Sequence, residues 1–529
     1  MIQQKNRVHF LLLGILLASL QVFAQLQQPA RFEKERKFSD EDFTIISLKE
    51  DGLALIREKN KYKSGNKTWE VILLDTALQE KQNFDLEIDQ RKNLIGYEQV
   101  AGSLYLLFKA GENFKLALDL IGINLKDAEI SRYEIKTELN LQLTHFIKVE
   151  SNFVLGGYVN SEPAVLLYNT LTDNTKVLPG FFQKQTELVD LRPNQNQTFN
   201  TILVDRSDRD QRKIVFKTFD ATGIELLEDA APIEDRYSLQ TSISSTLIQE
   251  DMMVLGTWGS KNSKQSNGFY ALVIDPFTDQ PIKFTAFGEL SSYLDQQSPK
   301  RAKKIKEKTK DAINEKRIPD FVNYVMPYRI EERPDGFILL AETYIPSTNV
   351  NRYPNNYPYG YTPYPYYSPF WGYYPGTYNR LYNPYYGYGP NTRNTDEIKG
   401  VQSVLIAFNP KGAVLWDYSL KLDDIRINSL EQITDFHVDG NRVIILYKKE
   451  SELKGKIITL GENEIKEFDE KIKLTNDADE IRSENRTNGL VRQWYGNNFY
   501  VWGQQTLLNK ERRGEGNRQV FYINKITFR

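Results

Sequence analysis

The sequence predicts an all-β fold, an eight-bladed β-propeller, with a seven-bladed ring plus one irregular unit as the alternative. Three observations lead to this prediction. A pattern of four short strands recurs about eight times, its period is close to fifty residues, and the N-terminal segment has the character of a missing last strand. Four-stranded units with such a period are typical of propellers, in which the blades surround a central channel.

The second strand of each unit gives the clearest register. Each is a dense apolar run such as LYLLF or VIILY, and the runs are centred on Leu55, Leu106, Leu155, Leu203, Leu255, Leu339, Ile445 and Val501. Successive centres are 51, 49, 48, 52, 84, 106 and 56 residues apart. A third apolar strand follows every centre, for example EVILLD at 70–75. Short apolar runs bounded by turn residues indicate buried strands.

The two long steps contain insertions. Segment 298–317 predicts a basic helix, with Ser298 as the N-cap and Pro299 at the first helical position. Its small and apolar residues recur at helical spacing, at Ala302, Ile305, Thr309 and Ala312. Segment 346–399 is rich in Tyr, Pro and Gly, and we expect no regular structure across it because Pro fixes φ and removes hydrogen-bond donors. Propeller topology places both insertions on one face, beside each other.

The eighth unit ends inside its third strand, at the end of the chain. The sequence RFEKERKF at 31–38 is similar to IKEFDEKI at 465–472, the fourth strand of the unit before. We therefore expect the N-terminal segment to complete the last blade as its outer strand. Such pairing closes the ring and removes an exposed sheet edge.

Residues 1–24 have the features of a secretory signal, namely a basic start, an apolar stretch and an Ala at position 24. We expect a single propeller domain over 25–529, exported to the periplasm or the cell surface, with no transmembrane segment in the mature chain. Loss of Lys5 and Arg7 leaves 66 basic residues against 70 acidic ones, which argues against a nucleic-acid binder. The absence of Cys excludes thiol chemistry and disulfides.

The most unusual segment is 351–391, with 14 Tyr and 8 Pro. Tyr offers a flat apolar face and a hydroxyl at little entropic cost, which suits stacking on sugars or on other aromatic rings. The predicted binding residues are Tyr361, Tyr364, Tyr366, Trp371 and Tyr373. The hypothesis is an exported, non-enzymatic binding or scaffold protein of the bacterial cell envelope that recognises a glycan or an envelope protein. The oligomeric state stays open, and so does a loop without a specific partner.

The basic helix allows two interpretations. Its Lys and Arg residues could dock an anionic polymer or a membrane surface. The simpler interpretation is a solvated charged face above apolar residues packed on the propeller, and the sequence favours this one because charge runs usually face solvent.

Catalytic and metal-binding patterns are absent from the sequence, and no cofactor is predicted. His145 and His437, the two histidines outside the signal, fall in first strands of opposite units, so one metal ion cannot be expected to bind both. Carboxylates at Glu187, Asp190 and Asp320 lie in or beside inner strands and keep one alternative open. That alternative is a polysaccharide-acting enzyme with its site at the channel mouth.

Segment 404–420, VLIAFNPKGAVLWDYSL, resembles a repeat of the pyrroloquinoline quinone propeller superfamily, with Gly412 in the turn and Trp416 at the position that docks between blades. The resemblance covers one unit in eight and implies an eight-bladed ring. It implies no catalytic residue, because the chain has no Cys for the vicinal disulfide of the quinone-dependent dehydrogenases of that superfamily.

Overall fold

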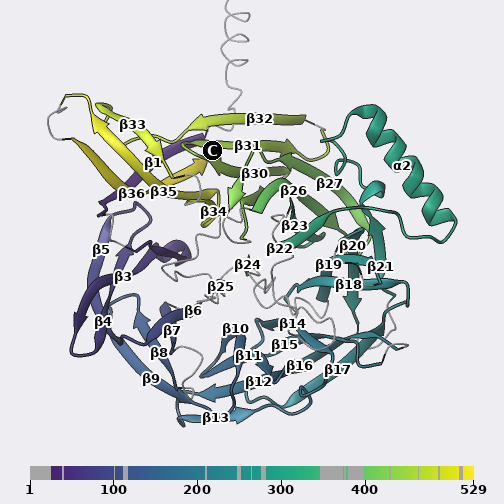
Figure 1. Cartoon of the computed structure of the whole chain (residues 1–529), viewed down its shortest axis with the longest axis horizontal. Coiled ribbons are helices and arrows are strands. Elements are labelled where there is room, and N and C mark those ends of the chain that lie inside the picture. Colours follow the sequence, from purple (N-terminus) through teal and green to yellow (C-terminus); the bar gives the residue numbers. More distant parts are fainter. Residues whose placement is uncertain are drawn as a thin grey trace, which may run out of the picture.

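The computed structural model is a ring of eight antiparallel sheets around a central channel (Figure 1), as the fifty-residue period predicts. It describes residues 26–529 apart from 38–40, 101, 111–116, 209–210, 247–251, 262, 264, 276–280, 346–372, 375–376, 379–397, 428–430, 463, 486–488 and 512–515. The predicted signal segment lies outside the described residues. No helix within the described part of the chain is both long and apolar enough to cross a membrane.

Blades 1 to 4 each contain four strands in chain order, the first strand lying next to the channel. Their strands are β2 (Thr44–Ser47), β3 (Leu53–Lys63), β4 (Asn66–Leu74) and β5 (Glu80–Asp89); β6 (Lys92–Val100), β7 (Ser103–Ala110), β8 (Ala117–Asn124) and β9 (Ile130–Lys136); β10 (Gln142–Val149), β11 (Asn152–Val159), β12 (Glu162–Asn169) and β13 (Asn174–Val177); β14 (Thr186–Pro193), β15 (Phe199–Asp205), β16 (Lys213–Phe219) and β17 (Glu225–Pro232).

Blades 5 to 8 follow the same plan, with additions in blades 6 and 8. Their strands are β18 (Tyr237–Ser244), β19 (Met252–Ser260), β20 (Gly268–Ile274) and β21 (Lys283–Ala286); β22 (Tyr324–Arg333), β23 (Gly336–Ile345), β26 (Ile398–Phe408) and β27 (Val414–Lys421), with the short β24 (Tyr373–Tyr374), β25 (Thr377–Tyr378) and β28 (Arg426–Ile427); β29 (Thr434–Asp439), β30 (Arg442–Lys449), β31 (Glu452–Thr459) and β32 (Glu464–Lys471); β33 (Asp479–Glu484), β34 (Val491–Gln493), β35 (Asn498–Asn509), β36 (Asn517–Phe528) and β1 (Leu26–Glu35).

The predicted second strands are confirmed in every blade, from β3 to β35. Their central residues are buried because both faces of each sheet pack against neighbouring blades. One apolar cluster, for example, joins Ile56 and Val71 of blade 1 to Leu94 and Leu106 of blade 2. The core is therefore a circle of apolar layers between blades, and this explains why these strands lack a polar alternation.

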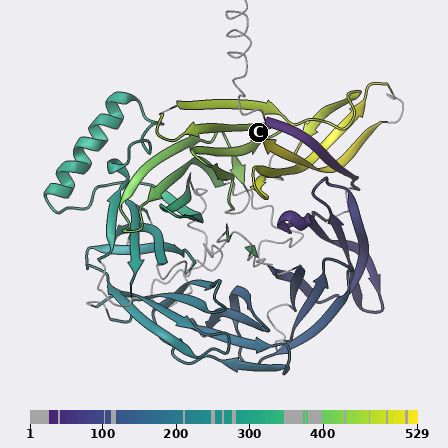
Figure 2. The same ribbon diagram turned by 180° about the vertical axis from the view of Figure 1, so that it is seen from behind.

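The N-terminal strand closes the ring, as predicted. β1 pairs with β36 in antiparallel register from Leu26↔Phe528 to Glu35↔Val520, so one blade contains both ends of the described chain. Figure 2 shows the purple N-terminal strand beside the yellow C-terminal ones. Phe32 packs against the cluster between blades 8 and 1, so the closure is stabilised by apolar contacts as well as backbone hydrogen bonds.

The predicted basic helix is α2, Pro299–Asn314, which begins after the N-cap Ser298 although the Ser298 side chain forms no capping hydrogen bond. The helix lies at the outer rim of the ring (Figures 1 and 2). The short 3-10 helices η1 (Lys49–Asp51) and η2 (Phe287–Glu289) complete the described elements. Trp416 of the segment that resembles a quinone-propeller repeat packs against the apolar cluster between blades 6 and 7.

Candidate functional site

A group of connected charged side chains lies on the channel side of blades 6 to 8. Arg329 of β22 donates to the carboxylate of Asp435 in β29 at 2.7 Å and to the carbonyl of Phe436 at 2.6 Å, and it also binds Glu331. Its guanidinium lies 4.3 Å from the centre of the Phe436 ring. The other oxygen of Asp435 accepts from the backbone N–H of Gln493 in blade 8 at 2.8 Å. Arg329 and Asp435 thus join three successive blades, and we call this group, with Lys49 and His437, the channel cluster.

Lys49 enters the channel cluster from blade 1, in the turn between β2 and β3. Its pKa is lowered to about 8, mainly by burial and also by repulsion from Arg329, against the charges of Asp435 and Glu331, which raise it. Its backbone has φ +57°, a left-handed conformation that is uncommon outside glycine. The chain therefore places a lysine with a lowered pKa beside a fixed ion pair.

His437 completes the channel cluster from the first strand of blade 7. Its Nε2 lies 2.8 Å from the amide oxygen of Asn497 in blade 8, and burial lowers its pKa. A neutral ring at pH 7 is suited to this hydrogen bond. The chemistry that the group permits is limited, because both oxygens of Asp435 already accept hydrogen bonds, from Arg329 and from the backbone N–H of Gln493.

Several buried carboxylates of the blades form hydrogen bonds or ion pairs with a neighbouring blade. Asp190 of β14 accepts from the backbone N–H and the hydroxyl of Ser244 in blade 5, at 2.7 and 2.6 Å. Glu342 of β23 accepts from the backbone N–H of Thr434 in blade 7 at 2.7 Å, and burial raises its pKa to about 7. Glu484 of blade 8 pairs with Lys448 of blade 7 at 2.6 Å. These groups hold neighbouring blades together, and their burial keeps them from a substrate.

The predicted candidate carboxylates are not a catalytic set in the structure. Asp190 is one of these inter-blade acceptors, and Glu187 forms a salt bridge with Arg206 at 2.8 Å. Asp320 is exposed in the connection before β22. The geometry gives none of the three the position of a paired acid and base.

The two histidines lie on opposite sides of the ring, as predicted, in β10 and β29. His145 is buried with its Nδ1 2.8 Å from the hydroxyl of Thr144, and burial lowers its pKa to about 4. No group of three or more His, Asp or Glu side chains that could hold a metal ion occurs among the described residues.

The predicted aromatic contacts fall mainly outside the described residues. This holds for Tyr361, Tyr364, Tyr366 and Trp371. Tyr373 begins the two-residue strand β24, whose backbone pairs with Arg329 of β22. The binding role of all five stays a prediction.

The strand ends of blade 6 confirm that both insertions leave from one end of this blade. Tyr324, where the chain arrives from α2, pairs with Tyr344 near the end of β23. Ile345, where the aromatic insertion leaves, pairs with Lys399 on its return. We call this the insertion end of blade 6.

Helix α2 carries six exposed cations whose side chains have no partner among the described residues. Ala302 and Ile305 pack on the apolar cluster of blades 5 and 6, and Lys306 donates to the carbonyl of Ser291 at 3.0 Å. The exposed face contains Lys300, Arg301, Lys303, Lys304, Lys308 and Lys310, which we call the α2 cations. None of the six forms a hydrogen bond or ion pair with another described residue.

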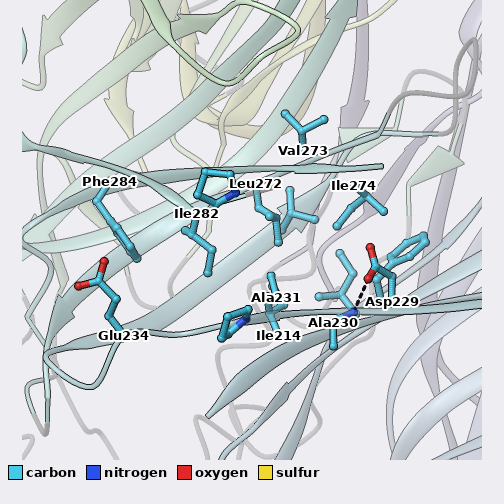
Figure 3. A pocket seen from close by; sticks show the side chains of 15 residues that line it. Ile214, Asp229, Ala230, Ala231, Glu234, Leu272, Val273, Ile274, Ile282 and Phe284 are labelled. Atoms are coloured by element: carbon cyan, nitrogen blue, oxygen red, sulfur yellow. Dashed lines mark hydrogen bonds between the residues drawn. The ribbon is translucent and has the colours of Figure 1, made fainter. Parts of the chain in front are cut away.

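An apolar groove of about 400 Å³ lies between blades 4 and 5 (Figure 3). Ile214 of β16 and Leu272 of β20 line it from the two blades, and small residues at Ala230 and Ala231 of β17 leave the space open. Asp229 accepts a hydrogen bond from the backbone N–H of Ala230 at 2.8 Å. The groove thus has apolar walls, and the only charged groups beside them are carboxylates. Such a lining suits the binding of an apolar group better than catalysis.

Comparisons with known proteins give no family. No protein-family model and no curated protein matches the chain. Solved structures with similar arrangements include polysaccharide lyase Uly1, 8% identical over 92% of this chain and 99% of that one, with a TM-score of 0.38. They also include the β-propeller domain of the Trilobed protease from Pyrococcus furiosus, 10% identical over 81% and 93% of the two chains, with a TM-score of 0.32. Likeness at this level transfers no substrate and no site residue.

Proposed function

We propose that the protein is an exported, non-enzymatic binding or scaffold propeller of the cell envelope. In this proposal the insertion end of blade 6 recognises a glycan or an envelope protein. The observation that supports the proposal is the distribution of polar groups. Buried carboxylates such as Asp190 and Glu342 bind neighbouring blades, whereas the exposed, unpaired cations and the aromatic insertion belong to one blade and its preceding connection.

A rigid ring suits such a role because loops on a fixed scaffold commonly carry recognition. Stacking by Tyr and Trp together with nearby cations would give affinity for a sugar or a protein surface with little loss of side-chain entropy. In the channel cluster, by contrast, Arg329 and Asp435 form hydrogen bonds that join neighbouring blades.

Export is tested first, by fractionating cells that produce the full chain. The expected result is a mature protein in the periplasm or at the cell surface whose N-terminus is Gln25. Full-length protein in the cytoplasm would reject the envelope location.

Recognition is tested with a variant in which Tyr361, Tyr364, Tyr366, Trp371 and Tyr373 are all replaced by Ser, which keeps the length of the insertion. Wild type and variant are compared for retention on defined glycans and on purified envelope fractions. We expect the variant to lose binding while its melting temperature stays unchanged. Equal retention of every partner would reject the role of these residues.

The alternative is a polysaccharide-acting enzyme that uses the channel. The proximity of Lys49, Glu331 and His437 is the feature that favours it. Release of new reducing or unsaturated ends from a polysaccharide would support this alternative, provided that the Lys49→Gln variant abolishes it.

A further inference from the structure

The α2 cations have an arrangement that helix stability alone would disfavour. Lys300, Lys304 and Lys308 follow one another at i, i+4 spacing, and like charges at this spacing destabilise a helix. The first turn contains Lys300 and Arg301 and no acidic residue, so cations lie at the positive end of the helix dipole. Glu307 and Asp311 are the two acids within the helix.

The surroundings relieve this repulsion only in part. The α2 cations are exposed, and none of their side chains forms an ion pair with a described carboxylate. Within the helix, Glu307 and Asp311 follow Lys304 and Lys308 at i, i+3 spacing, and two acids do not balance seven cations. The mature chain as a whole has more acidic than basic residues, so the cationic stripe is a local feature rather than a consequence of composition. Positions that violate a local rule without compensation inside the fold are expected at functional sites.

The helix is held in place by its buried face, so the backbone positions of its cations form a regular row along its axis. Thr309 and Ala312 are buried. The Thr309 hydroxyl packs so closely on Gly288 that a β-carbon at this glycine would lie 2.1 Å from it. Further along, Arg236 donates to the carbonyl of Lys316 at 3.1 Å and Asn267 to the carbonyl of Pro319 at 2.6 Å. The C-terminal end of the segment is therefore tied to blade 5.

We propose that the exposed face of α2 binds a linear polyanion, specifically an acidic polysaccharide, along the row Lys300, Lys304 and Lys308. This inference rests on the proposed binding role and names the chemistry of its ligand. The three lysines lie about 6 Å apart along the axis, which suits a chain with repeated charges better than a single anion. Five of the six cations are Lys, whose point charges favour diffuse electrostatic contact over bidentate recognition.

A lipid surface fits this face less well. Interfacial helices bury an apolar face in the bilayer boundary, whereas Ala302, Ile305 and Ala312 of α2 already face the propeller. Ile313 is the exposed large apolar residue of the helix. Only an electrostatic contact with lipid headgroups would remain, and vesicles provide the comparison.

The test compares wild type with the Lys300→Gln, Lys304→Gln, Lys308→Gln triple variant. The probes are polygalacturonate, neutral dextran of similar length, and vesicles of anionic phospholipid. A charge-matched control replaces Lys126, Lys184 and Lys471 with Gln; these three are exposed lysines of blades 2, 3 and 7 or their connections. Affinity is measured at low and at physiological salt, and melting temperature is measured for each protein.

We expect the triple variant to bind polygalacturonate about tenfold more weakly, from the loss of three exposed charge contacts. The control should bind like wild type, dextran should not bind, and the affinity should fall as salt rises. The melting temperature of the triple variant should stay equal or increase, because repulsion along α2 is relieved.

Equal affinity of the triple variant and wild type for polygalacturonate would overturn the proposal. So would equal losses in the triple variant and the control, or preferential binding of vesicles. A lower melting temperature of the triple variant alone would show that the lysines stabilise the fold, and would also overturn it. The proposed function is tested separately, because the variant with five aromatic residues replaced by Ser leaves the α2 cations unchanged. A failure of one proposal can therefore be told from a failure of the other.

Discussion

The closure of the ring by β1 gives the sharpest prediction for stability. Arg31 of this strand is almost fully buried, with 5% of its side chain exposed. Its guanidinium donates to Asn524 at 2.8 Å, to Gln505 at 2.9 Å and to Glu33 at 2.6 Å, and it lies over the ring of Tyr522. The Arg31→Met variant keeps the aliphatic length and removes all of these donors.

The expected loss follows from this contact set. Hydrogen bonds from a charged donor contribute about 1.5–3 kcal/mol each, and removing one partner of a buried pair costs about 3–5 kcal/mol in all. We take about 4 kcal/mol for Arg31→Met. An unfolding entropy of about 2.1 cal/mol/K per residue gives about 1 kcal/mol/K for a ring of about 500 residues, so the melting temperature should fall by about 4 °C.

The assay is thermal unfolding followed by fluorescence, with limited proteolysis of the N-terminal strand as a second readout. Arg91→Met is the matched control, because Arg91 is 59% exposed and forms a salt bridge with Asp89 two residues away. We expect the control to melt within about 0.5 °C of wild type. A melting temperature of Arg31→Met within 1 °C of wild type, or an equal decrease in the control, would refute the view that this pairing stabilises the ring.

Three further predictions concern the blades. Burial raises the pKa of Glu342 from 4.5 to about 7, so its carboxyl holds a proton more tightly in the folded than in the unfolded protein. The stability that this group contributes should therefore be full below pH 4.5 and should decline as the pH rises toward 7. Urea midpoints at pH 5 and 8 should therefore differ less in Glu342→Gln than in wild type. Gly336 has φ +145°, and a β-carbon there would lie 2.0 Å from the carbonyl oxygen of Phe408. The Gly336→Ala variant should therefore lose more than about 2 kcal/mol of unfolding free energy in the same denaturation measurement. Its control, Gly440→Ala at a turn with open space around it, should lose about 1 kcal/mol. Asp417 accepts from the backbone N–H of Ser292 at 2.7 Å, ahead of α2, so Asp417→Asn should speed hydrogen exchange in α2 while leaving blade 3 unchanged.

The register of the ring could be predicted because it depends on apolar density. Leu106, Leu255 and their counterparts are buried because each blade is covered on both faces by its neighbours. Such strands appear in a single sequence as dense apolar runs. The split of the first strand of blade 8 into β33 and β34 gave no such signal, because both pieces are short and mostly polar.

The carboxylates show where residue type fails as a guide to role. Asp190 in an inner strand has the same signature in sequence whether it faces a substrate or the backbone N–H of Ser244 in the next blade. Contacts between blades join residues far apart in sequence, from 36 positions for Lys448 and Glu484 to 106 for Arg329 and Asp435. The register alone does not give the direction of a side chain. The sequence did not reveal Lys49 for the same reason. Its neighbours Arg329 and Asp435 belong to blades 6 and 7, several hundred residues further along the chain.

The charge of α2 illustrates the opposite case, in which the pattern was visible and its meaning was not. The run of lysines fits a solvated face as well as a docking site, and the sequence favoured the former. What separates the two is whether the fold supplies counter-charges. Because no described carboxylate forms an ion pair with Lys300, Lys304 or Lys308, and the helix itself contains only Glu307 and Asp311, the repulsion within the helix is compensated only in part. A helix tied to blade 5 by buried contacts can tolerate that repulsion, and a ligand of opposite charge would remove it.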